Sequence, residues 1–290
     1  MACRNALRRL TPLPASANGF SRVALAPSLF YNCFNRMKTK LSLSLAVAAL
    51  SCMMGCSRQT TVDDSVVTMA TEATFPPYEY RVNDQFAGVD VDISAAIAKA
   101  LGKTLKVEDM KFDSVIPAVT TGKADWAAAG ITVTEDRKES VDFSIPYYRD
   151  AAQVIIVPVS SSIAGADDLK GKKIGVQSGT TGDTFMTQNY GDPERFDNAA
   201  IAISAMQAGR VDAVVIDEAP AKNFVADKAD LKILETPLTV EEYAIAVRKG
   251  NAKLLETINK VIEEMLEKGE IKALMEKHTK ATEVAVEPAA

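Results

Sequence analysis

From about residue 60 onward, short apolar runs alternate with longer segments of helical periodicity, and this alternation constrains the fold more than any other feature. The first series of units contains an expected strand at 66–70, a helix at 91–101 and a strand at 105–110, and a second series begins near Lys172. Repeated strand–helix units are typical of α/β folds with mostly parallel sheets. Two such series predict two lobes, each with its own mixed sheet flanked by helices.

The other expected elements extend the same pattern. The first series continues with a helix at 113–121 and a buried strand at 124–129 that places Trp126 in the core. The second series is predicted to contain a strand at 172–177, helices at 181–190 and 203–208, a strand at 212–216, a helix at 218–226 and a strand at 231–234. A strand at 243–247 and a helical stretch at 252–278, interrupted near Gly269, complete the chain.

The first 56 residues differ sharply from the rest in charge. They hold seven Lys or Arg and no acidic residue, which leaves the part after Cys56 with a formal charge of about −12. Nucleic-acid phosphates require a basic surface, so this acidic part is not expected to bind nucleic acid.

The N-terminal region reads as a secretory signal. A basic start at 37–40 is followed by an apolar stretch at 41–54 that is shorter than the roughly 20 residues a spanning helix needs. The stretch ends at Gly55-Cys56, which resembles a bacterial lipoprotein signal and predicts a lipid anchor on Cys56. Cys52 is a competing site, and a plain secretory signal is the alternative. Residues 1–36 fit neither scheme and are interpreted as an upstream extension before a true start at Met37.

The side chains that usually hold metals are scarce in the globular part. All four cysteines lie at or before Cys56, and the single histidine, His278, falls in the expected C-terminal helix. Neither a zinc site nor a Ser-His-Asp triad can be built from this set, so we expect no metal and no cofactor.

Residues that could bind an anion follow two of the predicted strands. Arg137 comes shortly after the strand at 124–129, and its guanidinium could grip a carboxylate with two hydrogen bonds, assisted by Thr132. The turn at 176–182 leads from a strand into a helix, whose free N–H groups attract anions. The alternative is that Thr134 caps a short helix and Arg137 is a solvated surface charge.

Two further features could complete a small-molecule site. Asp217 directly follows an apolar strand, where its carboxylate could face a cleft or cap the next helix. Phe75 and Phe112 also follow predicted strands and could hold a side chain between their rings, although core packing is the alternative for each.

Taken together, these segments resemble the polar amino acid family of periplasmic solute-binding proteins over about residues 65–280. The matching segments are ATEATFPPY (70–78), GVDVD (88–92), IPA (116–118), GKAD (122–125), GIT (130–132) through Arg137, DFS (142–144), PYY (146–148), GVQSGT (175–180) and DAVVID (212–217). The resemblance implies a two-lobed periplasmic-binding-protein fold, with two mixed sheets joined by a two-strand hinge that closes on a ligand.

The resemblance also implies how an amino acid would be held. Arg137, Thr132 and the N–H groups near Thr180 and Thr181 would bind the ligand carboxylate.

The rest of the site follows from the same resemblance. Asp217 and the Gly130 carbonyl would bind the ammonium, Phe75 and Phe112 would sandwich the side chain, and Glu72 would lie near its tip. Asp90 and Asp92 are expected to be structural.

The expected organisation follows from these matches. We expect an extension at 1–36, a signal at 37–55, a linker at 56–64, lobe 1 at 65–148 and 244–280, lobe 2 at 149–243 and a flexible tail at 281–290.

The function implied is capture of a polar L-amino acid outside the cytoplasm, as a lipid-anchored monomer, for delivery to an ABC import permease. Glu72 beside two aromatic rings favours a basic ligand such as lysine, arginine or ornithine, while glutamine stays open. Two alternatives remain: an enzyme on the same fold, such as a cyclohexadienyl dehydratase, and a ligand-sensing receptor module. An enzyme would need a poised acid or base, for which Glu72 is the one extra candidate, so we expect the chain not to be an enzyme.

Overall fold

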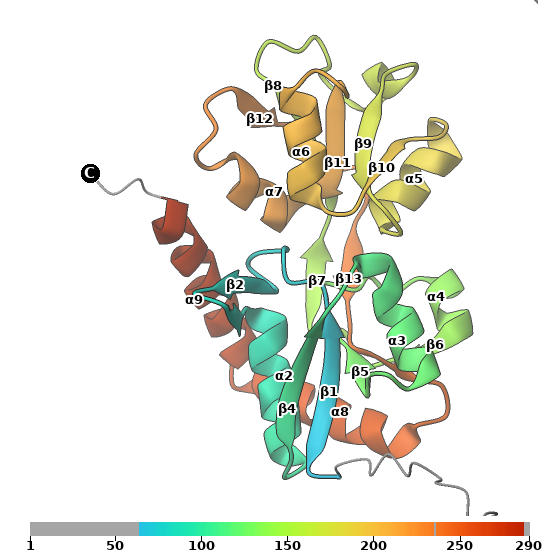
Figure 1. Cartoon of the computed structure of the whole chain (residues 1–290), viewed down its shortest axis with the longest axis vertical. Coiled ribbons are helices and arrows are strands. Elements are labelled where there is room, and N and C mark those ends of the chain that lie inside the picture. The colour runs from blue at the N-terminus through green and yellow to red at the C-terminus, as the bar shows by residue number, and fades with distance from the viewer. Residues whose placement is uncertain (1–63, 235, 287–290) are drawn as a thin grey trace, which may run out of the picture. The chain divides into compact units, whose positions relative to one another are not determined.

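The computed structural model describes residues 64–234 and 236–286. The extension, the predicted signal, Cys52 and Cys56 lie outside these residues. In the described part, two five-stranded sheets form the centres of two lobes, and helices cover both sheets (Figure 1). This architecture confirms the predicted two-lobed α/β fold.

The sheet of lobe 1 is parallel at one edge and antiparallel at the other. Its strands, in spatial order, are β4 (Thr104–Asp109), β1 (Val66–Thr71), β5 (Trp126–Ala127), β14 (Ala246–Arg248) and β6 (Val141–Phe143). Strand β1 runs parallel to β4 and β5, whereas β14 is antiparallel to β5 and β6. Met69 and Trp126 are fully buried, because both faces of the sheet are covered.

The helices of lobe 1 come from both ends of the chain. They are α2 (Val89–Ala100), a 3-10 turn (Phe112–Ser114), α3 (Val115–Thr121), α4 (Glu135–Ser140), α8 (Ala252–Glu267) and α9 (Glu270–Val286), with a small hairpin of β2 (Tyr80–Val82) and β3 (Gln85–Ala87). Helix α8 buries Ile258, Ile262 and Met265, whose spacing of three to four residues places them on one face.

Lobe 2 repeats the arrangement. Its sheet has the order β10 (Glu194–Phe196), β9 (Ile174–Gln177), β11 (Ala213–Asp217), β8 (Gln153–Pro158) and β12 (Leu231–Ile233). Strand β9 is parallel to β10 and β11, and β8 is antiparallel to β11 and β12. The helices are a 3-10 turn (Ala166–Leu169), α5 (Thr181–Asn189), α6 (Ala199–Gln207) and α7 (Glu218–Val225).

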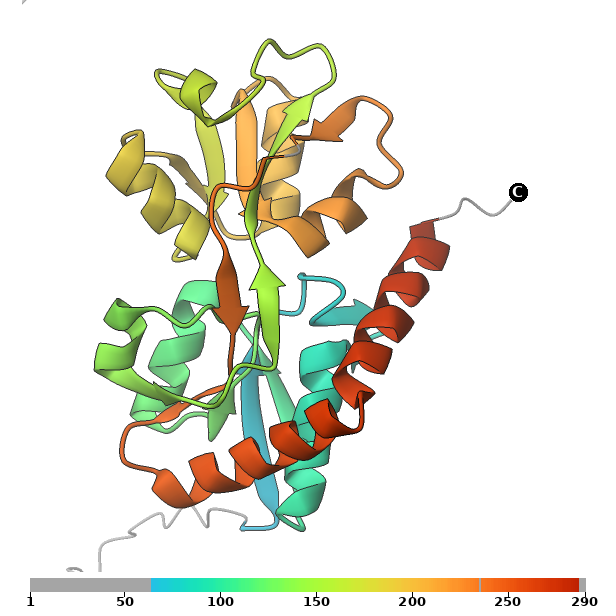
Figure 2. The same cartoon turned by 180° about the vertical axis from the view of Figure 1, so that it is seen from behind.

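Two short strands connect the lobes. Strand β7 (Tyr148–Ala151) leads into lobe 2, and β13 (Glu241–Tyr243) returns to lobe 1. They pair in antiparallel fashion, with Glu241 opposite Ala151 and Tyr243 opposite Tyr148. Figure 2 shows the two strands side by side between the sheets. A ribbon of this kind can bend without disturbing either sheet.

Several element boundaries differ from the sequence prediction. Helix α6 begins at Ala199 rather than at 203, because the Asn198 side chain caps it by accepting a hydrogen bond from the Ile201 N–H at 3.0 Å. The strand expected at 243–247 is divided between β13 and β14, since the chain leaves the hinge there and joins the sheet of lobe 1. Helix α9 continues to Val286, into the stretch predicted as a tail.

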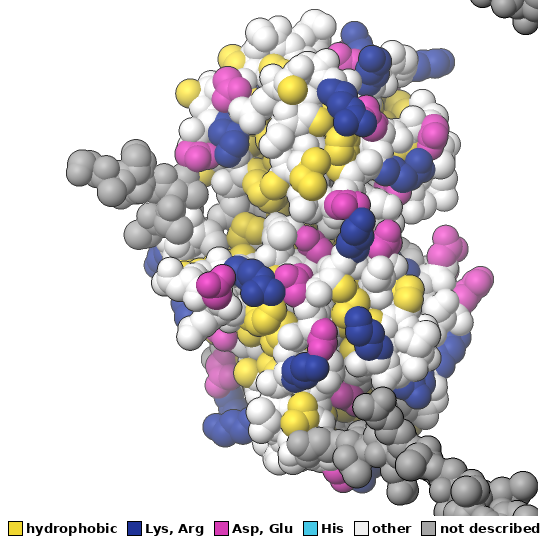
Figure 3. Space-filling model, viewed as in Figure 1, with side chains coloured by type: hydrophobic (Ala, Val, Ile, Leu, Met, Phe, Trp, Pro, Cys, Tyr) yellow, Lys and Arg dark blue, Asp and Glu magenta, His cyan; other side chains and the backbone are white. Residues whose placement is uncertain are grey.

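Two kinds of feature are absent from the described residues. No helix among them combines the length and apolar character needed to cross a membrane. They also contain no group of three or more His, Cys, Asp or Glu side chains arranged to hold a metal ion. On the face drawn in Figure 3, Lys and Arg side chains are interspersed with Asp and Glu, so this face lacks the continuous basic surface that nucleic acids require.

Candidate binding site

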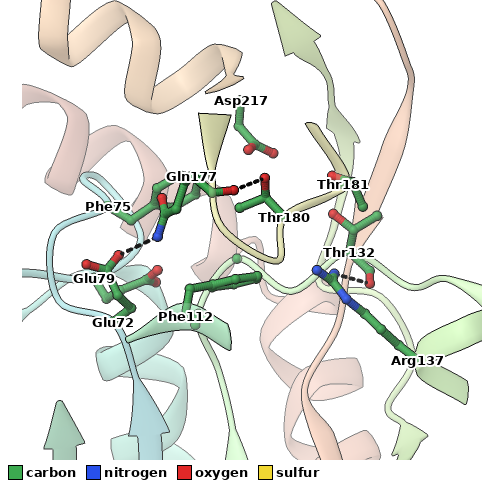
Figure 4. A pocket seen from close by; sticks show the side chains of 12 residues that line it. Glu72, Phe75, Glu79, Phe112, Thr132, Arg137, Gln177, Thr180, Thr181 and Asp217 are labelled. Carbon is green, nitrogen blue, oxygen red and sulfur yellow. Dashed lines mark hydrogen bonds between the residues drawn. The ribbon is translucent and has the colours of Figure 1, made fainter. Parts of the chain in front are cut away.

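The nine residues named from the sequence line one pocket between the lobes (Figure 4). They are Glu72, Phe75, Phe112, Gly130, Thr132, Arg137, Thr180, Thr181 and Asp217. Three more residues, which the sequence reasoning did not assign to the site, complete the wall: Glu79, Ala129 and Gln177.

Arg137 spans the gap between the lobes. Its Nη1 donates to the Thr132 carbonyl at 2.8 Å and its Nη2 to the Gly179 carbonyl in lobe 2 at 3.1 Å. The guanidinium also lies over the Phe112 ring, 5.3 Å from its centroid. A guanidinium has five N–H donors, so these contacts fix its plane and leave donors for a ligand.

The sequence left open whether Arg137 faces a binding site or is a solvated surface charge beside a helix capped by Thr134. Thr134 does cap α4, because its hydroxyl accepts a hydrogen bond from the Arg137 N–H at 3.2 Å. The Arg137 side chain, however, reaches the cavity instead of lying free on the surface. Burial lowers the pKa of Arg137, while the negative charges of Glu241 and Asp217 act in the opposite direction. The site therefore keeps a cation at the end that faces α5.

The first turn of α5 supplies N–H donors beside Arg137, where an anionic group of a ligand could bind. Thr180 is the N-cap residue, and its hydroxyl accepts a hydrogen bond from the Asp183 N–H at 3.2 Å. Thr181 is the first helical residue, so its N–H has no partner within the helix. Together with the helix dipole, such N–H groups favour a negative group at this point.

Asp217 lies at the carboxyl end of β11 and is 6% exposed. Its side chain makes no capping hydrogen bond to α7, so the interpretation as a helix cap is wrong. Its Oδ1 instead accepts a hydrogen bond from the Tyr243 hydroxyl of the hinge. Burial, reinforced by the charge of Glu241, raises the pKa of Asp217 to about 7. A cation bound beside it would favour the ionised form.

Gly130 permits the close packing of the cavity wall. Its φ is +54°, and a Cβ atom would lie 2.9 Å from Cε1 of Phe75. Its N–H donates to Oδ2 of the fully buried Asp90 at 2.9 Å, which agrees with the structural role expected for Asp90. Phe75 and Phe112 both line the cavity and provide its apolar surface.

The other end of the cavity is acidic. Glu72 is 5% exposed, and its carboxylate accepts hydrogen bonds from the Thr74 hydroxyl and, at 3.4 Å, from Nε2 of Gln177 in lobe 2. Burial raises the pKa of Glu72. Gln177 lies at the carboxyl end of β9, and this position was the sequence signal that could have identified it.

Glu79 is the more unusual member of this acidic end. It is 1% exposed, and neither of its carboxylate oxygens has a hydrogen-bond partner among the described residues. Burial, and then the charges of Asp90 and Glu72, raise its pKa well above the ordinary value. The raised pKa favours the neutral acid form of Glu79, and a cationic ligand beside it would favour the ionised form. Its position four residues after Phe75 in the same loop was the only sequence signal.

The lobes are closed over the cavity. The contacts of Arg137 with Gly179 and of Gln177 with Glu72 cross from one lobe to the other. At the rim, Lys111 of lobe 1 forms an ion pair with Asp197 of lobe 2 at 2.8 Å. The site therefore has a positive end, a negative end and an apolar middle, held between two bodies that share a hinge.

Comparisons with known proteins agree with this arrangement. The family model described as "Bacterial extracellular solute-binding proteins, family 3" matches residues 67–281. A probable histidine-binding protein of Neisseria gonorrhoeae is 33% identical over 258 residues, which cover 83% of this chain and 96% of the relative.

Solved structures give the same result. A mutant of ArgBP from T. maritima is 42% identical, with a TM-score of 0.71, and the match covers 74% of this chain and 96% of that one. The amino acid ABC transporter substrate-binding protein AbpA from Streptococcus pneumoniae, bound to L-arginine, is 32% identical with a TM-score of 0.72, and the match covers 77% and 97% of the two chains.

Proposed function

Because the chain belongs to family 3 of the bacterial extracellular solute-binding proteins, we propose that it captures a cationic L-amino acid, arginine first, and delivers it to an ABC import permease. The observation that carries the choice of ligand is the pair Glu72 and Glu79 at the end of the cavity opposite Arg137. A guanidinium presents several N–H donors in one plane, and two carboxylates without a basic partner match it.

The other end of the cavity suits the part common to all amino acids. Arg137 and the first turn of α5 would bind the α-carboxylate, and Asp217 would bind the α-ammonium. Phe75 and Phe112 would enclose the methylene groups between the two ends. The arginine-bound relative and the ArgBP relative support this assignment, because each covers about three quarters of this chain.

A thermal-shift screen of the protein against all amino acids and ornithine tests the proposal. We expect the largest stabilisation with arginine, then lysine and ornithine, and a small response to glutamine. A ligand at 100 times its dissociation constant stabilises the folded state by about 2.7 kcal/mol, which is easily measured. A largest response to an acidic or apolar amino acid would contradict the proposal.

The site offers no spare group for catalysis once an amino acid is bound. Arg137 and Asp217 would be paired with the zwitterion, and Glu72 and Glu79 with the side chain. A cyclohexadienyl dehydratase-like enzyme would need one of these carboxyl groups as a free acid or base. Incubation of the protein with prephenate or arogenate should therefore give no product, and turnover would establish the enzyme alternative.

The place of action follows from the family and from the N-terminal sequence. Solute-binding proteins of this family work outside the cytoplasm, and the segment at 37–55 has the features of an export signal. We infer that Cys56 carries the lipid that holds the protein at the membrane. The inferred working form is a monomer, because one chain contains both walls of the cavity.

A further inference from the structure

Glu241 lies on the hinge strand β13 and is 8% exposed, although the proposed capture of an amino acid assigns it no role. Its Oε2 accepts hydrogen bonds from the Thr132 hydroxyl at 2.7 Å and the Thr181 hydroxyl at 2.9 Å. Its Oε1 accepts from the Thr239 hydroxyl at 2.8 Å. Three threonine hydroxyls therefore converge on this one buried carboxyl group.

The donors to Oε2 come from different bodies. Thr132 lies in lobe 1, in the segment that follows β5, and Thr181 opens α5 in lobe 2. One oxygen of a hinge residue therefore joins both lobes. Opening of the lobes would break at least one of these two hydrogen bonds, because both hydroxyls can reach the same oxygen only when the lobes are together.

The same two threonines border the proposed carboxylate subsite. Since their hydroxyls donate to Glu241, they are not available to a ligand, and the ligand carboxylate must be bound by Arg137 and by backbone N–H groups. Glu241 also brings a negative charge near Arg137, and this charge acts to raise the pKa of Arg137. The Glu241 carboxylate thus orients Thr132 and Thr181, which border the subsite, and does not itself lie in the place proposed for the ligand carboxylate.

We infer that Glu241 is an interlobe clasp: a positioning residue that stabilises the closed arrangement and fixes Thr132 and Thr181 for binding of the ligand carboxylate. The inference rests on the proposed function for the identity of the ligand, but not for the contact between the lobes. Loss of the clasp should allow the closed complex to open sooner, so that the ligand dissociates faster while its association rate changes little.

The first test measures arginine dissociation by rapid mixing for wild type, Glu241→Ala and Glu241→Gln. We expect Glu241→Ala to dissociate about tenfold faster or more, because it removes a buried charged partner. Glu241→Gln retains one acceptor oxygen and should lie between Glu241→Ala and wild type. The matched control is Glu242→Gln, whose side chain is 44% exposed and pairs with Arg149 on the surface. A dissociation rate of Glu241→Ala within twofold of wild type would overturn the inference.

A double-mutant cycle separates the clasp from a general loss of stability. Thr181→Val removes the hydroxyl but keeps the backbone N–H. If the two residues act through one contact, Thr181→Val should change the dissociation rate much less in the Glu241→Ala background, which has no acceptor, than in wild type. Fully additive effects would show that each residue acts separately, and the clasp would be rejected.

A ligand-free measurement keeps this inference distinct from the proposed function. Amide hydrogen exchange without ligand should be faster in Glu241→Ala than in wild type within the segments 130–137 and 178–184, with exchange in β1 and β9 unchanged. Unchanged exchange at the lobe interface would overturn the clasp even if arginine binds. Failure of wild type to bind arginine would contradict the proposed function. The hydrogen-exchange comparison without ligand would still decide whether Glu241 joins the lobes.

Discussion

The hydroxyl of Tyr243, on the hinge, donates to the carboxylate of Asp217 at the end of β11 in lobe 2. This contact links the hinge strand β13 to the residue proposed to bind the ligand ammonium. It also explains why Asp217 does not cap α7, since its carboxylate is directed toward the hinge. Asp217 is therefore placed to respond to both the ligand and the position of the lobes.

The raised pKa of Asp217 predicts a pH dependence of the free protein. The pKa rises from 3.8 to about 7 on folding, so between these values the folded state binds more protons than the unfolded state. The free energy of unfolding should then fall as pH rises from about 4 to 7, by up to about 1.4 kcal/mol per unit from this one group. Asp217→Asn should reduce that slope.

Ligand binding should lower the pKa of Asp217 again, because an ammonium beside its carboxylate favours the ionised form. The thermal shift caused by saturating arginine should therefore be larger at pH 8 than at pH 5. Scanning calorimetry of wild type and Asp217→Asn at both values measures this, with the exposed Asp227→Asn as control. Equal shifts at the two pH values in wild type would contradict the assignment of Asp217 to the ammonium.

Arg137→Ala should weaken arginine binding by about 2–5 kcal/mol, because the ligand carboxylate would be buried without its charged partner. Titration calorimetry measures the change. Arg149→Ala is the matched control, since Arg149 is exposed and pairs with Glu242 outside the cavity. If Arg137→Ala binds arginine within about threefold of wild type, the carboxylate is bound elsewhere.

Glu72→Gln and Glu79→Gln should change selectivity rather than binding in general. Each should weaken arginine by about 1–3 kcal/mol, as a charge-assisted hydrogen bond becomes a neutral one, and leave glutamine nearly unchanged.

Paired titrations of arginine and glutamine decide the role of these two residues. Glu135→Gln, on the exposed face of α4, serves as the control. Equal losses for both ligands would mean that Glu72 and Glu79 support the loop at Phe75 and do not recognise the side chain.

Cys56→Ser should release the protein from the membrane fraction into the soluble fraction, since the lipid would have no acceptor. Cys52→Ser should leave the distribution unchanged. Fractionation of cells that express each variant, followed by immunoblotting, measures the result. Membrane association that survives Cys56→Ser but not Cys52→Ser would place the lipid on the earlier cysteine.

The sequence alone determined the two sheets and the residues at their strand ends. Alternating apolar runs and helical segments require buried parallel strands, and parallel strands bring their carboxyl ends to one edge. Arg137, Asp217 and Thr181 each follow such a strand, which made them candidates, but their convergence on one cavity was implied by the family resemblance and not by periodicity.

Only the tertiary structure decided which side chains face the cavity between the lobes. Glu79 and Gln177 were overlooked because their direction depends on how a loop folds and on the packing of one lobe against the other. The hydrogen bond from Tyr243 to Asp217 joins residues far apart in the chain, and so do the hydrogen bonds that the Thr132 and Thr181 hydroxyls donate to Glu241. Periodicity reports which face of an element is buried, whereas these hydrogen bonds depend on the relative position of two separate bodies.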